Sequence, residues 1–182
     1  MKMNRKGFTL IEVIVVAGII AILAGILVPM IFNQIDEAKI ARAQADMKSI
    51  QNSIMLFKKD TSSWPDKTAP GVVGVTTLYS DGGLPTFGNN WAAPSLVPSL
   101  SDHLKADPTG SYGTSWKGPY INAVDADPWG RAYVINADQF NTTSPVWIVS
   151  AGPDGTIQTD ALGNTCADKA NGGNDDICLR LK

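Results

Sequence analysis

The N-terminal part of the sequence contains an apolar run that can fold in very few ways. Between Phe8 and Phe32 the only charged side chain is Glu12. A helix over these residues would be about 37 Å long, at about 1.5 Å per residue, which exceeds the roughly 30 Å thickness of a bilayer's hydrocarbon core. The run therefore predicts a transmembrane helix at residues 8–32.

A short basic segment precedes this run. Lys2, Arg5 and Lys6 favour a cytoplasmic position for the N-terminus, so that the rest of the chain lies across the membrane. A secretory signal is cut after its apolar region. Here the sharp boundary lies before the apolar region, between Gly7 and Phe8. Cleavage there would remove residues 1–7 as a leader peptide and leave the apolar helix as the new N-terminus.

The residues around this boundary carry a family resemblance. The segment Gly7-Phe8-Thr9-Leu10-Ile11-Glu12 resembles the processing site of the type IV pilin-like proteins, which include pilins and the pseudopilins of secretion systems. The resemblance implies a prepilin peptidase and N-methyltransferase that cleaves after Gly7 and methylates Phe8. It also matches Glu12 to the family's acidic residue and Pro29 to the proline that bends its helix.

A carboxylate within a bilayer is costly and is usually paired or functional, which makes Glu12 a candidate assembly residue. The nearest cation would be the α-amino group that cleavage creates at Phe8. Pairing with that group in a neighbouring subunit would favour a homo-oligomeric filament of packed helices. The alternative is that Glu12 lies near the membrane edge and reaches water.

The helical pattern continues beyond the apolar run. Met47, Ile50, Ile54 and Phe57 recur at helical spacing, and neither Gly nor Pro occurs from residue 33 to residue 60. We therefore expect one helix from Phe8 to near Asp60, whose amphipathic part at 33–60 packs on a globular head at 61–182.

The head is expected to be rich in loops and to complete an α+β fold with a short antiparallel sheet. Residues 64–116 are interpreted as an irregular connection with one short helix, capped by Ser99 or Ser101. Segments with the β-branched and aromatic composition of strands predict the sheet. The predicted helix and strands are Ser99–Lys105, Arg131–Asn136, Val146–Ser150 and Ile177–Leu181.

The two cysteines, Cys166 and Cys178, lie in the part of the chain expected outside the cytoplasm. A disulfide is the default pairing in an oxidising compartment and would stabilise the tail by about 2–4 kcal/mol. Two free buried thiols are the alternative. A zinc site is disfavoured because His103 is the only histidine.

Two segments of the head are similar to the C-terminal signature of the major pseudopilins of type II secretion systems, the G subunits. They are Trp116–Ile121 and Asp127–Tyr133. Within the second, Asp127-Pro128-Trp129-Gly130 predicts a turn with the tryptophan as its buried anchor.

The resemblance extends to a closing loop made of Ser150–Gly155 and Gly172–Ile177. In the G subunits this loop binds calcium. The implied ligands here are the carboxylates of Asp154, Asp175 and Asp176 and the main-chain carbonyl of Ala151.

The chain departs from the family pattern in this loop. Nineteen residues separate Gly155 from Asp175, and the two cysteines bracket most of the excess. A disulfide would constrain this loop as calcium does, and a disulfide in place of the metal is one alternative. A turn at Asp154 and a solvated loop at Asp175 and Asp176 are another.

These features favour a structural subunit over an enzyme, since no catalytic constellation is found. The resemblance implies a single-pass inner-membrane protein with a periplasmic head that polymerises to drive the export of folded proteins. Implied partners are minor pseudopilins, the inner-membrane assembly platform and its ATPase. The net charge of −2 argues against nucleic acid as a partner. The alternative function is a type IV pilin forming a surface fibre for adhesion or motility.

Overall fold

The computed structural model describes residues 7–88, 90–91, 99–168 and 174–182. The chain divides into two compact units, Met1–Ala38 and Lys39–Lys182. We call the described part of the first unit the stem. The described part of the second unit is called the head from here on, and it includes residues 39–60 of the long helix as well as the expected head at 61–182. The basic residues of the expected leader, at positions 2, 5 and 6, lie outside the described residues.

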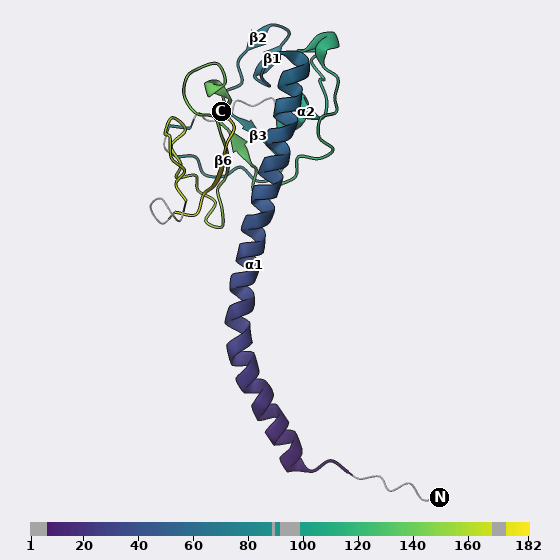
Figure 1. Cartoon of the computed structure of the whole chain (residues 1–182), viewed down its shortest axis with the longest axis vertical. Helices are drawn as coiled ribbons and strands as arrows, with labels where there is room; N and C mark the ends of the chain where they lie inside the picture. Colours follow the sequence, from purple (N-terminus) through teal and green to yellow (C-terminus); the bar gives the residue numbers. More distant parts are fainter. Residues whose placement is uncertain (1–6, 89, 92–98, 169–173) are drawn as a thin grey trace, which may run out of the picture. The chain divides into compact units, whose positions relative to one another are not determined.

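The long N-terminal helix is confirmed. Helix α1 spans Leu10–Thr61, 52 residues, and begins two residues later than expected (Figure 1). It is helical without interruption at Pro29, and the bend expected there stays a prediction. The stem and the first turns of the head therefore share one continuous helix.

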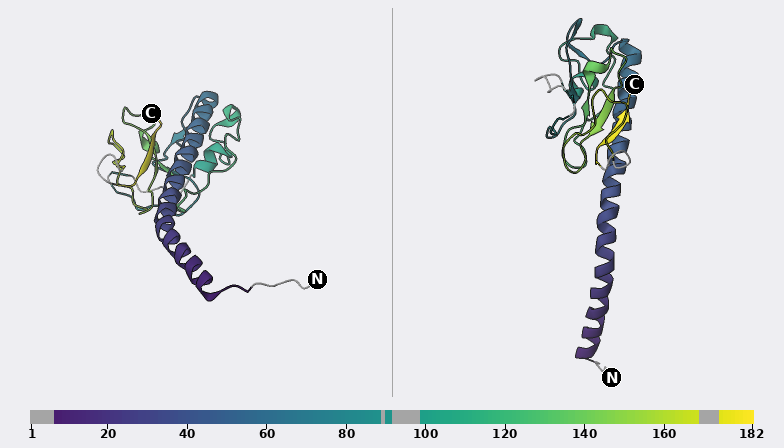
Figure 2. Two further views of the ribbon diagram at one scale, coloured as in Figure 1. Left: turned by 60° about the horizontal axis from the view of Figure 1, so that its bottom comes forward. Right: turned by 90° about the vertical axis from the view of Figure 1, so that its left-hand side faces the viewer.

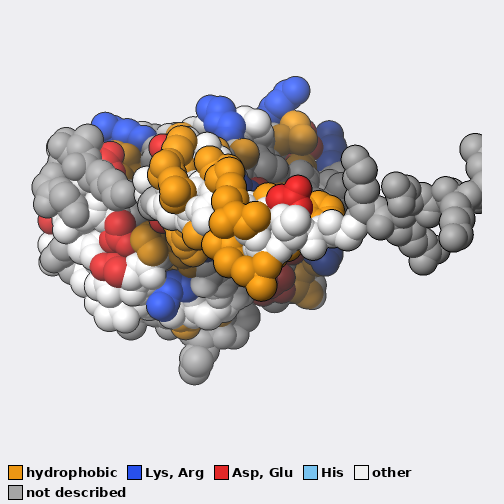
Figure 3. Space-filling view, turned by 90° about the horizontal axis from the view of Figure 1, so that it is seen from below, with side chains coloured by type: hydrophobic (Ala, Val, Ile, Leu, Met, Phe, Trp, Pro, Cys, Tyr) orange, Lys and Arg blue, Asp and Glu red, His pale blue; other side chains and the backbone are white. Residues whose placement is uncertain are grey.

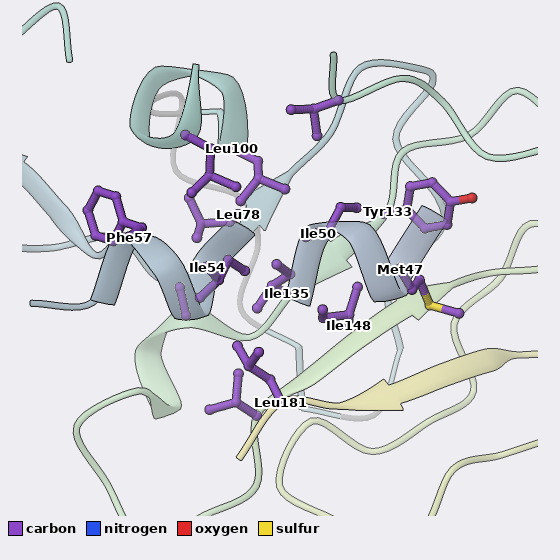
Figure 4. Packing of buried hydrophobic residues seen from close by; sticks show 14 of the residues in the cluster. Met47, Ile50, Ile54, Phe57, Leu78, Leu100, Tyr133, Ile135, Ile148 and Leu181 are labelled. Atoms are coloured by element: carbon purple, nitrogen blue, oxygen red, sulfur yellow. The ribbon is translucent and has the colours of Figure 1, made fainter. Parts of the chain in front are cut away.

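The head is built on the apolar stripe of α1 that the helical periodicity indicated. Met47, Ile54 and Phe57 are fully buried, and Ile50 is nearly so. Figure 4 shows these side chains facing residues from the sheet and from the short helix of the head. The buried partners that it labels are Leu78, Leu100, Tyr133, Ile135, Ile148 and Leu181.

A four-stranded antiparallel sheet lies beside the C-terminal part of α1 in both views of Figure 2. Its strands pair in the order β3-β4-β5-β6. Val149 of β5 lies between Val134 of β4 and Cys178 of β6 in the register. The bounds are β3, Leu78–Tyr79; β4, Val134–Ile135; β5, Trp147–Ser150; and β6, Ile177–Arg180.

The expected strands at 146–150 and 177–181 are confirmed to within one residue. The strand expected at 131–136 is shorter, because only Val134–Ile135 pair on both sides, while Arg131 forms an isolated bridge with Gly83. The short helix is confirmed as α2, Leu100–Leu104. Its cap is Ser99, whose backbone N–H donates to the Asp102 carboxylate at 2.9 Å.

The segment interpreted as irregular contains more structure than expected. It holds β3 and a separate two-stranded antiparallel sheet, β1 (Lys67–Ala69) and β2 (Val72–Val73). These strands have two or three residues each, too few for a period-two pattern to mark them in the sequence. Two 3-10 turns complete the elements, at Gly113–Ser115 and Ala137–Gln139.

The turn at 127–130 is present, but its most deeply buried side chain is Asp127 rather than the tryptophan. Trp129 is partly buried and packs against the hydrophobic core, as expected, and Asp127 is buried more deeply, at 4 % exposed. Oδ1 of Asp127 accepts the backbone N–H groups of Trp129 at 3.0 Å and Arg131 at 2.8 Å, and Oδ2 accepts the Ser150 hydroxyl at 2.6 Å. The buried carboxylate, fully hydrogen-bonded, thus joins the turn to the end of β5.

Candidate functional site

The N-terminus of α1 is closed by a capping box that the sequence reading missed. Oε2 of Glu12 accepts the backbone N–H and the hydroxyl of Thr9, both at 2.8 Å. The Thr-x-x-Glu spacing of residues 9–12 is the usual signal for this motif and was available in the sequence. Glu12 therefore satisfies helix donors within its own chain, in addition to the assembly role expected for it.

Just before this cap lies the expected processing site. Gly7 and Phe8 precede the first helical residue, and Phe8 is 83 % exposed. A Cβ on Gly7 would have no atom within 4 Å. The peptide bond between these residues is thus exposed and outside regular secondary structure, as a protease substrate has to be.

The stem exposes an apolar surface along its whole length. Its large hydrophobic side chains from Leu10 to Ile35 are between 45 and 77 % exposed, and Figure 3 shows hydrophobic side chains gathered at the near end of the helix. Within the described residues α1 is the one helix long and apolar enough to cross a membrane. A helix that is hydrophobic all round needs lipid or other helices around it.

At the other end of the chain, the disulfide between Cys166 and Cys178 is confirmed, with the Cα atoms 6.0 Å apart. Cys178 belongs to β6, so the bond attaches residue 166 to the edge strand of the sheet. The alternative of two free thiols is wrong.

The structure brings Asp154 and Asp175 together. The backbone N–H of Asp154 donates to Oδ2 of Asp175 at 2.9 Å. The carboxylate of Asp154 itself accepts the backbone N–H of Thr156 at 2.7 Å and the side-chain amide of Gln158 at 2.6 Å. The backbone of Asp154 therefore contacts the carboxylate of Asp175, and each of the two carboxylates is hydrogen-bonded within the loop.

The third carboxylate, Asp176, is enclosed by the protein. It is only 2 % exposed, and its Oδ2 accepts three hydrogen bonds from Gln158 and Thr159. No donor from the described part of the chain reaches its Oδ1. Burial raises the pKa of the Asp176 carboxyl above its usual value, and the hydrogen bonds from Thr159 oppose this shift. A buried carboxylate oxygen without a partner is the group that a bound cation would satisfy.

Backbone geometry requires glycine beside these acids. Gly152 has a φ of +61°, and a Cβ there would lie 2.4 Å from the carbonyl oxygen of Asp175. Ala151 is fully buried, and its carbonyl accepts the N–H of Gly155 at 3.3 Å in a turn. The loop thus folds tightly against the residues that precede β6.

The residues of this loop fit calcium in the type of donor atoms that they offer. Carboxylate and carbonyl oxygens are the ligands that calcium prefers. Within the described residues, however, no three side chains of Asp, Glu, His or Cys are gathered as a metal-binding group. Among the described residues the structure thus does not gather these three carboxylates into one site. The role of Asp154, Asp175, Asp176 and the carbonyl of Ala151 as calcium ligands stays a prediction from the resemblance. Gly172 and Gly173 of the compared loop lie outside the described residues.

His103 has a structural environment rather than a catalytic one. It is 2 % exposed on α2, and its Nδ1 lies 2.8 Å from the hydroxyl of Tyr112. Burial lowers the pKa of His103 to about 4, against the opposing effect of Asp102 and Asp107. The imidazole is therefore neutral at neutral pH, and it packs in the core.

Two family models match the chain. A model described as the prokaryotic N-terminal methylation motif matches residues 2–28. A model described as type II secretion system protein G matches residues 89–168. Together they cover the processing site and the part of the head that carries the turn at Asp127 and the first half of the C-terminal loop.

Three curated relatives, each named type II secretion system core protein G, are similar over most of their length. The protein of Pseudomonas aeruginosa is 30 % identical over 84 % of this chain and 86 % of its own. That of Vibrio cholerae is 30 % identical over 95 % and 89 %, and that of Escherichia coli K12 is 28 % identical over 86 % and 88 %. No solved structure matches the chain.

Proposed function

Because the chain belongs to the family of type II secretion system core protein G, we propose that it is a major pseudopilin, a structural subunit that polymerises through α1. The single observation that carries this function is the exposed apolar stem, most of which lies within a matched methylation motif. Such a surface is covered by lipid before assembly and by neighbouring stems afterwards. Growth of the filament then drives the export of folded proteins.

The processing steps follow from the same motif. A prepilin peptidase cleaves after Gly7 and methylates the new N-terminal Phe8. The basic leader supports an orientation with the N-terminus in the cytoplasm and the head in the periplasm. Minor pseudopilins, the inner-membrane platform and its ATPase are the partners of this assembly, and no catalytic role is proposed for the chain.

Filaments are expected in material from native envelopes. Electron microscopy with an antibody against the head should find this polypeptide in short periplasmic filaments. Mass spectrometry of the same material should give a chain that begins at methylated Phe8. An intact leader in assembled protein would contradict the proposal.

A second candidate function is favoured by one observation, the disulfide that bounds the C-terminal loop. Surface fibres of the type IV pilin class also carry such loops. The same microscopy decides between the two, because abundant long fibres sheared from the cell surface would assign the chain to adhesion or motility.

We propose calcium as a ligand of the C-terminal loop. The support is the buried Oδ1 of Asp176, which has no donor among the described residues, and the contact between the backbone of Asp154 and the carboxylate of Asp175. When bound, calcium would supply positive charge to these acids and cross-link the loop to β6. The carbonyl of Ala151 would be a further ligand.

Chelation is expected to lower the thermal stability of the head. The full chain in detergent micelles should lose about 5 °C in melting temperature when EDTA replaces calcium at about ten times its dissociation constant. Tryptophan fluorescence reports on the head, because all five tryptophans lie between residues 64 and 147. Magnesium is the matched control. Equal melting temperatures in calcium and EDTA would refute the site.

A further inference from the structure

The hydroxyl of Thr159 connects the two ends of the disulfide-closed loop. Thr159 is fully buried. Its Oγ1 accepts the backbone N–H of Ala167 at 3.0 Å and donates to Oδ2 of Asp176 at 2.6 Å. The direction is fixed, because an amide nitrogen only donates and the carboxylate only accepts. The single hydroxyl therefore links the residue after Cys166 to the residue two before Cys178.

The disulfide also packs against the hydroxyl of Thr159. Oγ1 of Thr159 lies 3.2 Å from Sγ of Cys178 and 3.9 Å from Sγ of Cys166. Sulfurs in a disulfide carry no hydrogen, so these are packing contacts and the hydroxyl proton stays with Asp176. The bond thus fixes both chain segments against which the hydroxyl rests.

This arrangement determines which oxygen of Asp176 is available. Oδ2 receives the backbone N–H of Gln158 at 2.9 Å and both the N–H and the hydroxyl of Thr159 at 2.6 Å. Three donors on one oxygen hold the orientation of the carboxylate. They leave Oδ1 buried and without a donor among the described residues. A desolvated oxygen held in one place is suited to bind a cation.

We propose that Thr159 is a positioning residue for the cation site: held by the Cys166–Cys178 disulfide, it fixes Asp176 as a calcium ligand. This inference rests on the calcium binding proposed above. The disulfide then supports the metal rather than replacing it. Ligands that are themselves hydrogen-bonded bind metals more tightly, because less order has to be imposed on binding.

Calcium titrations of three variants of the full chain in detergent test the proposal. Trp91 is the probe, because its indole N–H donates to the carbonyl of Thr159 at 2.7 Å. Thr159→Val keeps the side-chain shape but removes the hydroxyl, and should weaken calcium binding about tenfold. Thr159→Ser keeps the hydroxyl and should restore wild-type affinity. The double variant Cys166→Ala/Cys178→Ala should lose affinity about as Thr159→Val does.

Each outcome decides the proposal. If Thr159→Val binds calcium with wild-type affinity and only its melting temperature without calcium is lower, Thr159 is purely structural. That result would overturn the proposal. If Thr159→Val does not fold, unchanged affinity in the cysteine variant would overturn it instead. A wild-type chain that gives no calcium response would refute both this inference and the calcium site. The filament function would stand in that case, because its test is the presence of processed filaments in the envelope.

Discussion

Glu12→Gln is expected to lower filament yield by about 100-fold, as Glu12→Ala is, while both variants still insert into the membrane. In the proposed filament the Glu12 carboxylate pairs with the α-amino group of Phe8 on a neighbouring subunit. An intramembrane charge that finds its partner gains about 3 kcal/mol over an unpaired one. Without the carboxylate the subunits keep their apolar stems, but they lose the ion pair that favours assembly over the membrane-inserted monomer.

Glutamine is the informative substitution because Glu12 also caps α1. Its Oε2 accepts the N–H and the hydroxyl of Thr9. Glutamine keeps an acceptor oxygen at the third position of a capping box, so it preserves the cap and removes only the charge. If capping were the whole role of Glu12, Glu12→Gln would assemble normally and only Glu12→Ala would fail.

The measurement compares filaments with total membrane protein. Immunoblots of sheared or sedimented filaments give the yield, and the membrane fraction shows whether each variant is inserted and cleaved. Thr9→Val is the matched control for the cap, since it removes the hydroxyl that donates to Glu12 and keeps the charge. Normal filament yield from Glu12→Gln would contradict the pairing mechanism.

The head is expected to lose about 3 kcal/mol of stability through His103 when the pH falls from 7 to 4. Burial lowers the pKa of His103 in the folded head to about 4, from the usual 6.5. The unfolded chain therefore takes up this proton first. The contribution is fully present above pH 6.5 and is lost as the pH falls towards the folded pKa.

Burial, rather than the charged groups around His103, determines the direction of its pKa shift. Asp102 and Asp107 raise its pKa, but burial outweighs them, and the Tyr112 hydroxyl at Nδ1 is uncharged. Asp66 changes the stability in the opposite direction. Burial raises its pKa in the folded head, so its protonation in acid stabilises the folded state relative to the unfolded chain.

Comparison with a histidine variant isolates the effect. His103→Asn has no proton to gain, and it places an amide near the position of Nδ1. The difference in unfolding free energy between the wild type and this variant should shrink by the stated amount between pH 7 and pH 4. Denaturant unfolding, followed by tryptophan fluorescence, measures it. A difference that does not change with pH would show that His103 is not buried in solution.

Several elements could be predicted from the sequence because their signals are local. The stripe of Met47, Ile54 and Phe57 marks a helix by its spacing alone. The strands at 147–150 and 177–180 have the β-branched composition that a buried sheet needs. The capping box at Thr9 and Glu12 has an equally local signal, the Thr-x-x-Glu spacing at the start of the helix.

Other features depended on contacts between distant residues. The strands β1, β2 and β3 are too short to show a pattern, and each exists because a partner supplies its hydrogen bonds. In the turn at 127–130, composition favoured the tryptophan as the buried anchor. The tryptophan packs against the core, but Asp127 is buried more deeply, because Ser150 and two backbone amides satisfy its carboxylate.

The amino-acid sequence by itself determined the processing site, the apolar helix and the pairing of the only two cysteines. The first two follow from residue types and spacings within one segment, and the pairing follows because the sequence has only two cysteines. Only the tertiary structure decided how the acids of the C-terminal loop differ. Asp175 and Asp176 are adjacent in sequence, yet Asp176 alone is buried, because folding places Thr159 against its carboxylate. A hydrogen bond between residues 17 positions apart leaves no pattern in the sequence, and it determines which oxygen of Asp176 has no donor among the described residues.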